Sequence, residues 1–176
     1  MPQNYENVFI PFCGGGSYLT LFKQKNIYAS DILPDVINIF NCLKLHPTHL
    51  KDSYKDHYNK LVSHGQNYYY EVRDNYNKHR SANDFLWLTR TCFNGLIRFN
   101  PKNEFNVSFH HNRKGIEPQK FEKIVDEWNC LVNIFNQCRF ICEDYRKTLC
   151  YVKARDFVIL DPPYLQTKGQ YQMQFC

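Results

Sequence analysis

VFIPFCGGGS, at positions 8–17, joins a short apolar run to a glycine triplet. Such a run, ending at glycine, is typical of a buried strand that passes into a loop. The apolar residues within 19–22 then predict a helix that Ser17 could cap. A second strand is expected over 27–31 and a second helix over 34–44, where a proline suits the first turn. This alternation predicts an α/β protein with a parallel sheet and right-handed crossovers.

A polar insertion interrupts this pattern from about residue 51. Positions 51–80 are rich in Tyr and Lys, and we expect them to be helical in parts, chiefly over 68–78. Positions 84–96 are more apolar and have a helical pattern. Positions 98–115 mix Asn, Phe, His and basic residues without regular spacing, which predicts an irregular segment.

The sheet pattern returns in the last third of the chain. Apolar residues recur at three and four over 118–137, which predicts an amphipathic helix. Short apolar runs at 139–142 and 157–160 predict two further strands. The expected division is a domain made of residues 1–50 and 118–176, with residues 51–117 inserted into it.

The composition excludes several classes of protein. Of the 176 residues, 43% are hydrophobic and 22% charged, which is ordinary for a globular chain and unlike disordered or coiled-coil sequences. No apolar run approaches the roughly 18 residues that span a bilayer, and the start has no basic-then-apolar leader, so we expect no membrane partner. The net charge of +5 permits an anionic partner without requiring one. The eight cysteines include no CxxC pair, which favours reduced thiols in the cytoplasm over disulfides or a metal site.

Four segments that can carry chemistry follow the four expected strands. They are the glycine triplet, Asp31, the residues after Cys142, and the stretch that begins at Asp161. In open α/β sheets, ligands bind outside the carboxyl ends of the strands, so we expect one site on this rim. Glycines let a ligand approach the backbone closely, and a carboxylate after the second strand can accept both hydroxyls of a ribose. A tight turn for the glycines and a helix cap for Asp31 are the simpler alternatives.

Asp161-Pro162-Pro163-Tyr164 is the most specific of these segments. Two prolines fix φ twice and remove two backbone donors, which leaves free carbonyls beside a carboxylate and an aromatic ring. This combination suits an amino group on a planar ring: the carboxylate and a carbonyl accept its two hydrogens, and the tyrosine stacks on the ring. A rigid turn at the end of a strand is the alternative interpretation.

PFCGGGS at 11–17, Asp31 and DPPY at 161–164 resemble the cofactor loop, the ribose acid and the catalytic tetrapeptide of amino-methylating DNA methyltransferases. In the insertion, YYEVRDNYN at 69–77 and RTCFNGLIRFN at 90–100, followed by EFNV at 104–107, are similar to the Dam-type (D12 class) adenine-N6 DNA methyltransferases. The resemblance runs from Val8 to Tyr164 in the family's order.

The resemblance implies a fold and an activity. The fold would be a Rossmann-like S-adenosylmethionine-dependent methyltransferase sheet without its C-terminal strands, carrying a mostly helical DNA-recognition region at 51–117. The activity would be methyl transfer from S-adenosylmethionine to N6 of an adenine flipped out of duplex DNA, with no metal. The implied cofactor-binding residues are Phe12, Gly14, Gly16, Asp31, Asp144, Tyr145 and Asp161. The implied catalytic residues are Asp161, Pro162, Pro163 and Tyr164.

The same resemblance assigns the reading of DNA to the insertion. Arg98 would contact a guanine edge, where arginine makes bidentate hydrogen bonds. Weaker candidates for a base or phosphate are Asn94, Asn100 and Arg113. A turn at Asn94 and a solvated charged loop at Arg113 are the simpler alternatives. Relatives often recognise GATC, but Ser108 replaces their usual proline and the His110-His111 pair stands where a glycine is common.

The ends of the chain add a further expectation. By comparison with the family, a cofactor-holding segment before the first strand and the strands after Tyr164 are missing. We therefore expect either a fragment that requires a second polypeptide or a copy that no longer catalyses. The alternative functions are a non-catalytic DNA- or partner-binding remnant and an amino-methyltransferase acting on RNA.

Overall fold

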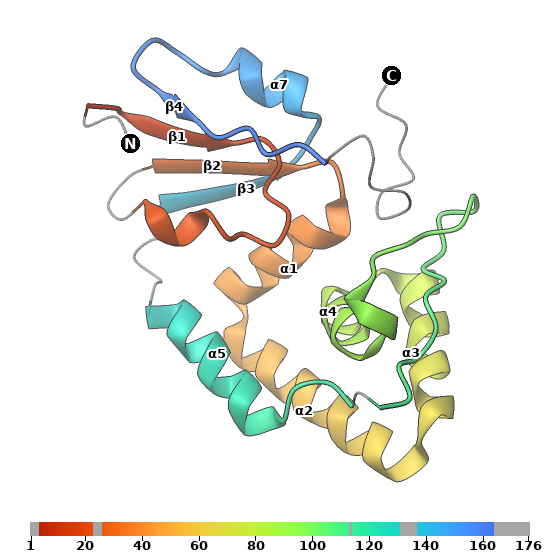
Figure 1. The fold of residues 1–176 in the computed structure, drawn as a ribbon. Helices are drawn as coiled ribbons and strands as arrows, with labels where there is room; N and C mark the ends of the chain where they lie inside the picture. The colour runs from red at the N-terminus through yellow and green to blue at the C-terminus, as the bar shows by residue number, and fades with distance from the viewer. Residues whose placement is uncertain (1–3, 23–25, 113, 131–136, 164–176) are drawn as a thin grey trace. The chain divides into compact units, whose positions relative to one another are not determined.

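The computed structural model describes residues 4–22, 26–112, 114–130 and 137–163, drawn as a ribbon in Figure 1. These residues form two compact units, one made of the chain up to Pro47 with Ile124–Pro162, the other built mainly from Thr48–Lys123. In chain order the elements are β1 (Asn7–Ile10), η1 (Leu19–Leu21), β2 (Asn26–Asp31), α1 (Pro34–Leu45), α2 (Pro47–His64), α3 (Gln66–His79), α4 (Ala82–Thr91), η2 (Phe93–Gly95), α5 (Pro118–Cys130), β3 (Cys138–Cys142), α7 (Tyr145–Cys150) and β4 (Phe157–Val158).

The first unit contains a four-stranded sheet in the order β3-β2-β1-β4, and every neighbouring pair is parallel. This confirms the expected α/β class and all four expected strands. Val8 of β1 lies in register with Ile27 of β2 on one side and with Phe157 of β4 on the other. β4 is short, but the N–H of Ile159 still donates to the carbonyl of Phe9 at 2.9 Å. The chain therefore reverses its direction of winding at β1, between β2 and β4.

Helices cover both faces of this sheet. Phe140 of β3 stacks on Phe40 of α1, with ring centroids 4.9 Å apart. Ala29 of β2 lies in register with Phe140, and successive side chains of a strand point to opposite faces. Its neighbour Ser30 therefore faces the other way, where its hydroxyl lies 2.6 Å from that of Thr148 in α7. The α1 and α7 helices thus pack on opposite faces, as in a doubly wound fold.

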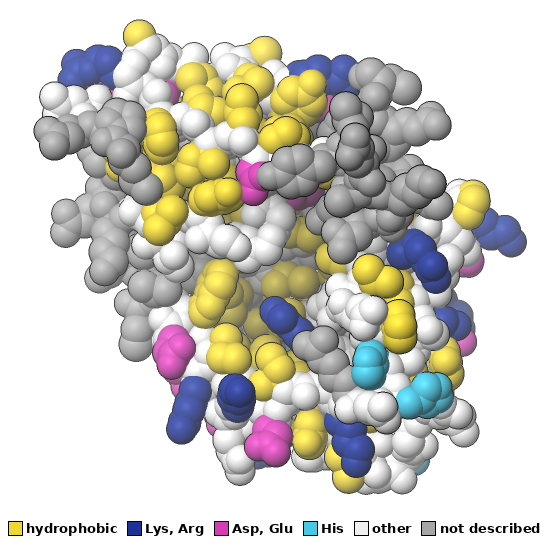
Figure 2. Space-filling model, in the orientation of Figure 1, with side chains coloured by type: hydrophobic (Ala, Val, Ile, Leu, Met, Phe, Trp, Pro, Cys, Tyr) yellow, Lys and Arg dark blue, Asp and Glu magenta, His cyan; other side chains and the backbone are white. Residues whose placement is uncertain are grey.

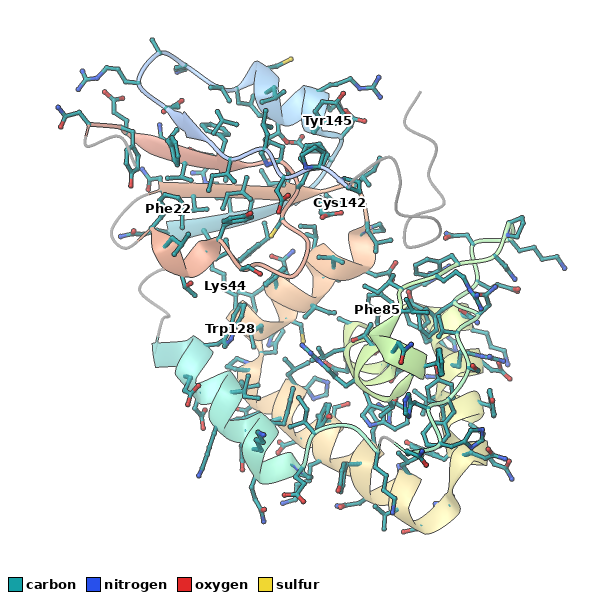
Figure 3. The ribbon with its side chains drawn as sticks, in the orientation of Figure 1. Phe22, Lys44, Phe85, Trp128, Cys142 and Tyr145 are labelled. Carbon is teal, nitrogen blue, oxygen red and sulfur yellow. The ribbon has the colours of Figure 1, made fainter. Side chains whose placement is uncertain are left out.

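The expected helix α1 is confirmed. Pro34 occupies its first turn, and the buried residues Val36, Ile37, Phe40 and Leu43 repeat at helical spacing. Near its end, the Lys44 ammonium donates to the carbonyl of Cys138 at 2.9 Å, which ties the helix to β3. Figure 3 labels Lys44 together with Trp128 of α5, whose ring centroid lies 6.1 Å from that of Phe40.

The helix expected after the glycine triplet is wrong in part. The structure has only the 3-10 turn η1, preceded by Tyr18 rather than Ser17, and no side chain caps it. The N–H of Gly16 donates to Cys13 and that of Leu19 to Gly16, so the loop consists of consecutive tight turns instead of an α-helix. Leu19 and Phe22 are nevertheless buried in the core.

The second unit is more helical than the sequence pattern indicated. α2 and α3 together cover almost all of residues 47–79, where helix was expected only in parts. The pattern was misleading because tyrosines supply much of the buried face: Tyr54 in α2, and Tyr69 and Tyr76 in α3. The predicted helix over 84–96 is too long, since α4 ends at Thr91 and a short turn follows.

A buried polar cluster joins α2, α3 and α4 in this unit. The carboxylate of Asp84, in α4, accepts from Asn75 at 2.8 Å and lies 3.1 Å from Nε2 of His57. The other ring nitrogen of His57 lies 2.8 Å from the hydroxyl of Tyr68. Because both oxygens of the Asp84 carboxylate have partners, its burial is compensated. Phe85, labelled in Figure 3, is fully buried beside this cluster.

Three further findings concern the described residues only. None of their helices combines the length and apolarity that crossing a bilayer requires. Six of their cysteines, at positions 13, 42, 92, 138, 142 and 150, are free thiols. No group of three or more potential metal ligands gathers in this part of the chain.

Candidate functional site

The carboxyl ends of the four strands meet at one rim, because all the strands are parallel. β1 leads into the glycine loop, β2 ends at Asp31, β3 ends at Cys142 and β4 leads to Asp161. Cys142 and the neighbouring Tyr145 are labelled at this end of the sheet in Figure 3. This confirms the expectation that the four segments share a rim. The winding reverses between β1 and β4, and ligands bind at such switch points in open α/β sheets.

Asp31 fixes the glycine loop to the end of β2. Its Oδ2 accepts a hydrogen bond from the N–H of Gly14 at 2.9 Å, and its Oδ1 accepts from that of Leu33 at 3.0 Å. The helix cap itself is Leu33, so Asp31 supports the approach to α1 without being the cap residue. A carboxylate has about four lone-pair sites, so two remain for an added ligand.

The three glycines of the loop have different surroundings. Gly14 has φ +47°, and a Cβ added to Gly14 or Gly15 would meet no atom within 4 Å. Gly16 has φ +77°, and its Cβ would lie 2.7 Å from the Phe40 ring. The backbone at Gly14 and Gly15 therefore borders open space, whereas Gly16 is required by packing against α1.

An aromatic pair stands beside the loop. The rings of Phe12 and Tyr145 are 5.1 Å apart and tilted by 31°, and both residues are half-buried. Tyr145 is thus on the rim and not in the core. Asp144 caps α7 and accepts from the backbone N–H and guanidinium of Arg146, bonds that lower the pKa of its carboxyl. Asp144 was predicted to bind the cofactor, but both of its carboxylate oxygens accept hydrogen bonds from Arg146.

A hydrogen-bonded chain holds α7 behind the rim. The hydroxyl of Thr148 lies 2.6 Å from that of Ser30 and donates to Oε1 of Glu143 at 2.9 Å. The N–H of Glu143 donates to the carbonyl of Asp31 at 3.1 Å. Glu143 therefore has a structural role, connecting the end of β3 to β2.

Asp161 has a partner that sequence reasoning missed. The hydroxyl of Tyr18, just after the glycine triplet, donates to its Oδ2 at 2.9 Å. Asp161 and Pro162 are exposed and Pro163 is half-buried. Tyr164 lies outside the described residues. A phenol two residues after the glycine triplet, on the same rim as the predicted catalytic carboxylate, is the signal that could have identified Tyr18.

The residues predicted to read DNA lie in the second unit. Arg98 is exposed, and its Nε donates to the side chain of Asn106 at 2.8 Å, while one terminal nitrogen reaches the Asn106 carbonyl at 3.4 Å. Asn100 closes a turn: its side chain accepts from the N–H groups of Lys102 and Glu104. Asn94 has φ +53° and belongs to a turn, which agrees with the simpler alternative. Arg113 lies outside the described residues.

The segment that carries Arg98 forms a small hairpin, with Phe99 bridged to Phe105. Helix α3 supports it through side chains. Asn77 donates to the carbonyl of Phe105 at 3.1 Å and accepts from its N–H at 2.7 Å. The buried Tyr69 hydroxyl donates to the carbonyl of Val107 at 2.9 Å. A polar hollow of about 400 Å³ lies between α3 and the hairpin.

Residues 1–174 match the family model of the D12 class N6 adenine-specific DNA methyltransferases. The chain is 32% identical to Type II methyltransferase M.MjaIII of Methanocaldococcus jannaschii, over 92% of this chain and 59% of that protein. It is 32% identical to a DNA adenine methylase of Serratia marcescens, over 88% and 56%. For the DNA adenine methylase of Escherichia coli K12 the identity is 30%, over 88% and 54%. The chain thus spans a little over half the length of these curated relatives.

Proposed function

We infer the function from the family, because this chain belongs to the D12 class of N6 adenine-specific DNA methyltransferases. The proposed reaction is transfer of a methyl group from S-adenosylmethionine to N6 of an adenine turned out of duplex DNA. One observation carries the proposal: the parallel strands bring the glycine loop, Asp31 and Asp161 to the same rim, at the switch point of the sheet.

The residues of this rim fit S-adenosylmethionine. The space beside Gly14 and Gly15 leaves room for a ligand against the backbone. Asp31 keeps two lone-pair sites for ribose hydroxyls. The rings of Phe12 and Tyr145 offer apolar faces to an adenine. When bound, S-adenosylmethionine would supply a methyl group attached to a positively charged sulfur, and transfer of that methyl group leaves the rest of the cofactor as a neutral thioether.

Asp161 and the Pro162 carbonyl would act on the target amine. An adenine must leave the duplex first, because its N6 is otherwise paired. Two acceptors that hold the two N6 hydrogens draw the nitrogen toward tetrahedral geometry, which frees its lone pair for attack. After transfer the nitrogen must lose one proton, and the Asp161 carboxylate is the nearest acceptor in this scheme. Orientation of this kind supplies about 7–11 kcal/mol at best. Tyr164 would stack on the extruded base.

We propose that residues 51–117 read the DNA, with Arg98 at a guanine edge. A guanidinium has two donor edges, and Asn106 occupies the edge that includes Nε. The outer edge, formed by the two terminal nitrogens, stays available for the O6 and N7 atoms of guanine. Asn94, Asn100 and Arg113 remain weaker candidates. Figure 2 shows basic and acidic side chains interspersed on the face drawn. DNA binding would therefore depend on individual side-chain contacts more than on the overall charge of this face.

The wider setting is also part of the proposal. Duplex DNA is the proposed partner, and the cytoplasm is the proposed compartment, since six of the described cysteines are free thiols and disulfides persist in oxidising compartments. The relatives described above indicate no second polypeptide.

A methylation assay tests the function. Purified protein is incubated with S-adenosylmethionine and duplex oligonucleotides, and N6-methyladenine is measured by mass spectrometry after nucleoside digestion. We expect methylated adenine with the wild type and none with Asp161→Ala. The control is Asp156→Asn, at the amino end of β4, which should stay active. Activity of Asp161→Ala equal to wild type, or a preference for RNA, would contradict the assignment.

A further inference from the structure

We propose that Tyr18 is a positioning residue that orients the Asp161 carboxylate toward the target amine. The inference deepens the proposed function and rests on it. The contact that carries it is the hydrogen bond from the Tyr18 hydroxyl to Oδ2 of Asp161, 2.9 Å long, between residues 143 positions apart in the sequence. It joins the loop after β1 to the segment after β4, directly across the switch point of the sheet.

Tyr18 lies on a turn whose backbone is fixed from both sides. Before it, the Gly16 carbonyl accepts from the N–H of Leu19 at 3.0 Å. After it, the carbonyl of Tyr18 accepts from the N–H of Leu21 at 3.1 Å. The side chains of Leu19 and Phe22 are almost fully buried and anchor this turn in the core. The phenol therefore projects from a rigid base.

The backbone that leads to Asp161 is fixed to β1, the strand that precedes the glycine loop. The N–H of Ile159 donates to the carbonyl of Phe9 in β1 at 2.9 Å. Beyond that bond the side chain of Asp161 is exposed, so water alone would leave its torsions free. Among the described residues, Tyr18 is the partner that limits this freedom.

The hydrogen bond also gives the two oxygens of the Asp161 carboxylate different roles. Oδ2 accepts from Tyr18, so Oδ1 is presented to an amine hydrogen in a defined plane. A misplacement of about 1 Å at a reacting group can cost on the order of 100-fold in rate. Loss of the Tyr18 hydroxyl should therefore slow methyl transfer. It removes no charged group from the cofactor site.

The test is Tyr18→Phe, which keeps the ring and deletes only the donor. Single-turnover methylation of a duplex oligonucleotide is measured together with S-adenosylmethionine affinity by calorimetry. We expect the transfer rate to fall about 10- to 100-fold and the cofactor dissociation constant to change less than twofold. Tyr151→Phe is the matched control, because Tyr151 is exposed at the end of α7 in the same unit. It should retain the wild-type rate within twofold.

Two further variants separate positioning from folding. Fluorotyrosine at position 18 keeps a hydroxyl donor and should preserve the rate within a few fold. In an Asp161→Asn background, Tyr18→Phe should add little, since the residue acts through that carboxylate. An unchanged rate for Tyr18→Phe, or an equal loss of cofactor affinity, would overturn the positioning role while wild-type activity stands. Absence of methylation by the wild type would instead remove the proposed function and this inference with it.

Discussion

Replacing Gly14, Gly15 and Gly16 by alanine, one at a time, separates packing from ligand space within a single loop. Alanine at Gly16 meets two penalties. Its φ of +77° disfavours any side chain, by about 1–2 kcal/mol. Its Cβ would also lie 2.7 Å from Cζ of Phe40 and 2.9 Å from Cδ1 of Leu19, well inside van der Waals contact. Overpacking of this kind costs about 1–3 kcal/mol, so we expect a total loss of about 2–5 kcal/mol.

Phe40 cannot easily move aside, because its ring stacks on that of Phe140 at 4.9 Å. The other two glycines should behave differently. Gly14→Ala has the backbone penalty alone, about 1–2 kcal/mol, since nothing lies within 4 Å of the added carbon. Gly15→Ala has neither penalty and should stay within about 0.5 kcal/mol of wild type. Both substitutions, however, place a methyl group in the space proposed for the cofactor.

Thermal unfolding and calorimetric titration with S-adenosylmethionine measure the two effects separately. For a chain of this size each kcal/mol corresponds to about 2–4 °C in Tm, so Gly16→Ala should unfold about 4–20 °C earlier. Gly15→Ala should keep its Tm and bind the cofactor at least about tenfold more weakly, which corresponds to about 1.4 kcal/mol. The reasoning fails if Gly15→Ala binds normally, or if Gly16→Ala is as stable as Gly15→Ala.

Four other predictions concern the hairpin and the thiols. Tyr69→Phe should lower stability by about 1–3 kcal/mol, because the Val107 carbonyl keeps only a 3.5 Å bond from Arg73; thermal unfolding beside a Tyr70→Phe control measures this. Arg98→Ala should cost about 1–3 kcal/mol of discrimination at one guanine, read from methylation rates on oligonucleotides substituted base by base; uniform loss on all of them would contradict base reading. Burial raises the pKa of the Cys13 thiol from 9.0 to about 12, so about one molecule in ten thousand carries the reactive thiolate at pH 8, and iodoacetamide should label the exposed Cys150 before Cys13. Because the unfolded thiol ionises near 9 and the folded one near 12, this group's contribution to stability should fall as the pH rises between those values, which alkaline unfolding curves can check.

The sheet and its rim could be predicted from the sequence because their signals are local. An apolar run ending at a glycine triplet, and another ending at an acid and two prolines, mark strand ends without any tertiary information. Parallel pairing then requires that these ends lie on one edge, as Gly14 and Asp31 do. The 3-10 turn at Leu19 was missed because the buried residues Leu19 and Phe22 fit a helical pattern equally well.

The second unit was harder to predict because its core consists largely of tyrosines. Tyr54, Tyr69 and Tyr76 are buried but count as half-polar in any hydropathy pattern, so the extent of α2 and α3 was underestimated. Long-range side-chain pairs leave no local signal at all. The bond between Tyr18 and Asp161, which are 143 positions apart in the sequence, depends on distances and rotamers that only the fold determines.

The two units hold their predicted functional residues in different ways, and this has a physical consequence. On the rim, the strands and backbone hydrogen bonds of the sheet set the positions of the loop and of Asp161, so many side-chain changes elsewhere should leave the site intact. The hairpin that carries Arg98 has few backbone bonds of its own and depends on Asn77 and Tyr69 from α3. Changes on α3 can therefore shift the hairpin without disturbing the rim. Under the proposed function, specificity for a DNA sequence could then change through residues that never touch DNA, while the chemistry of methyl transfer stays the same.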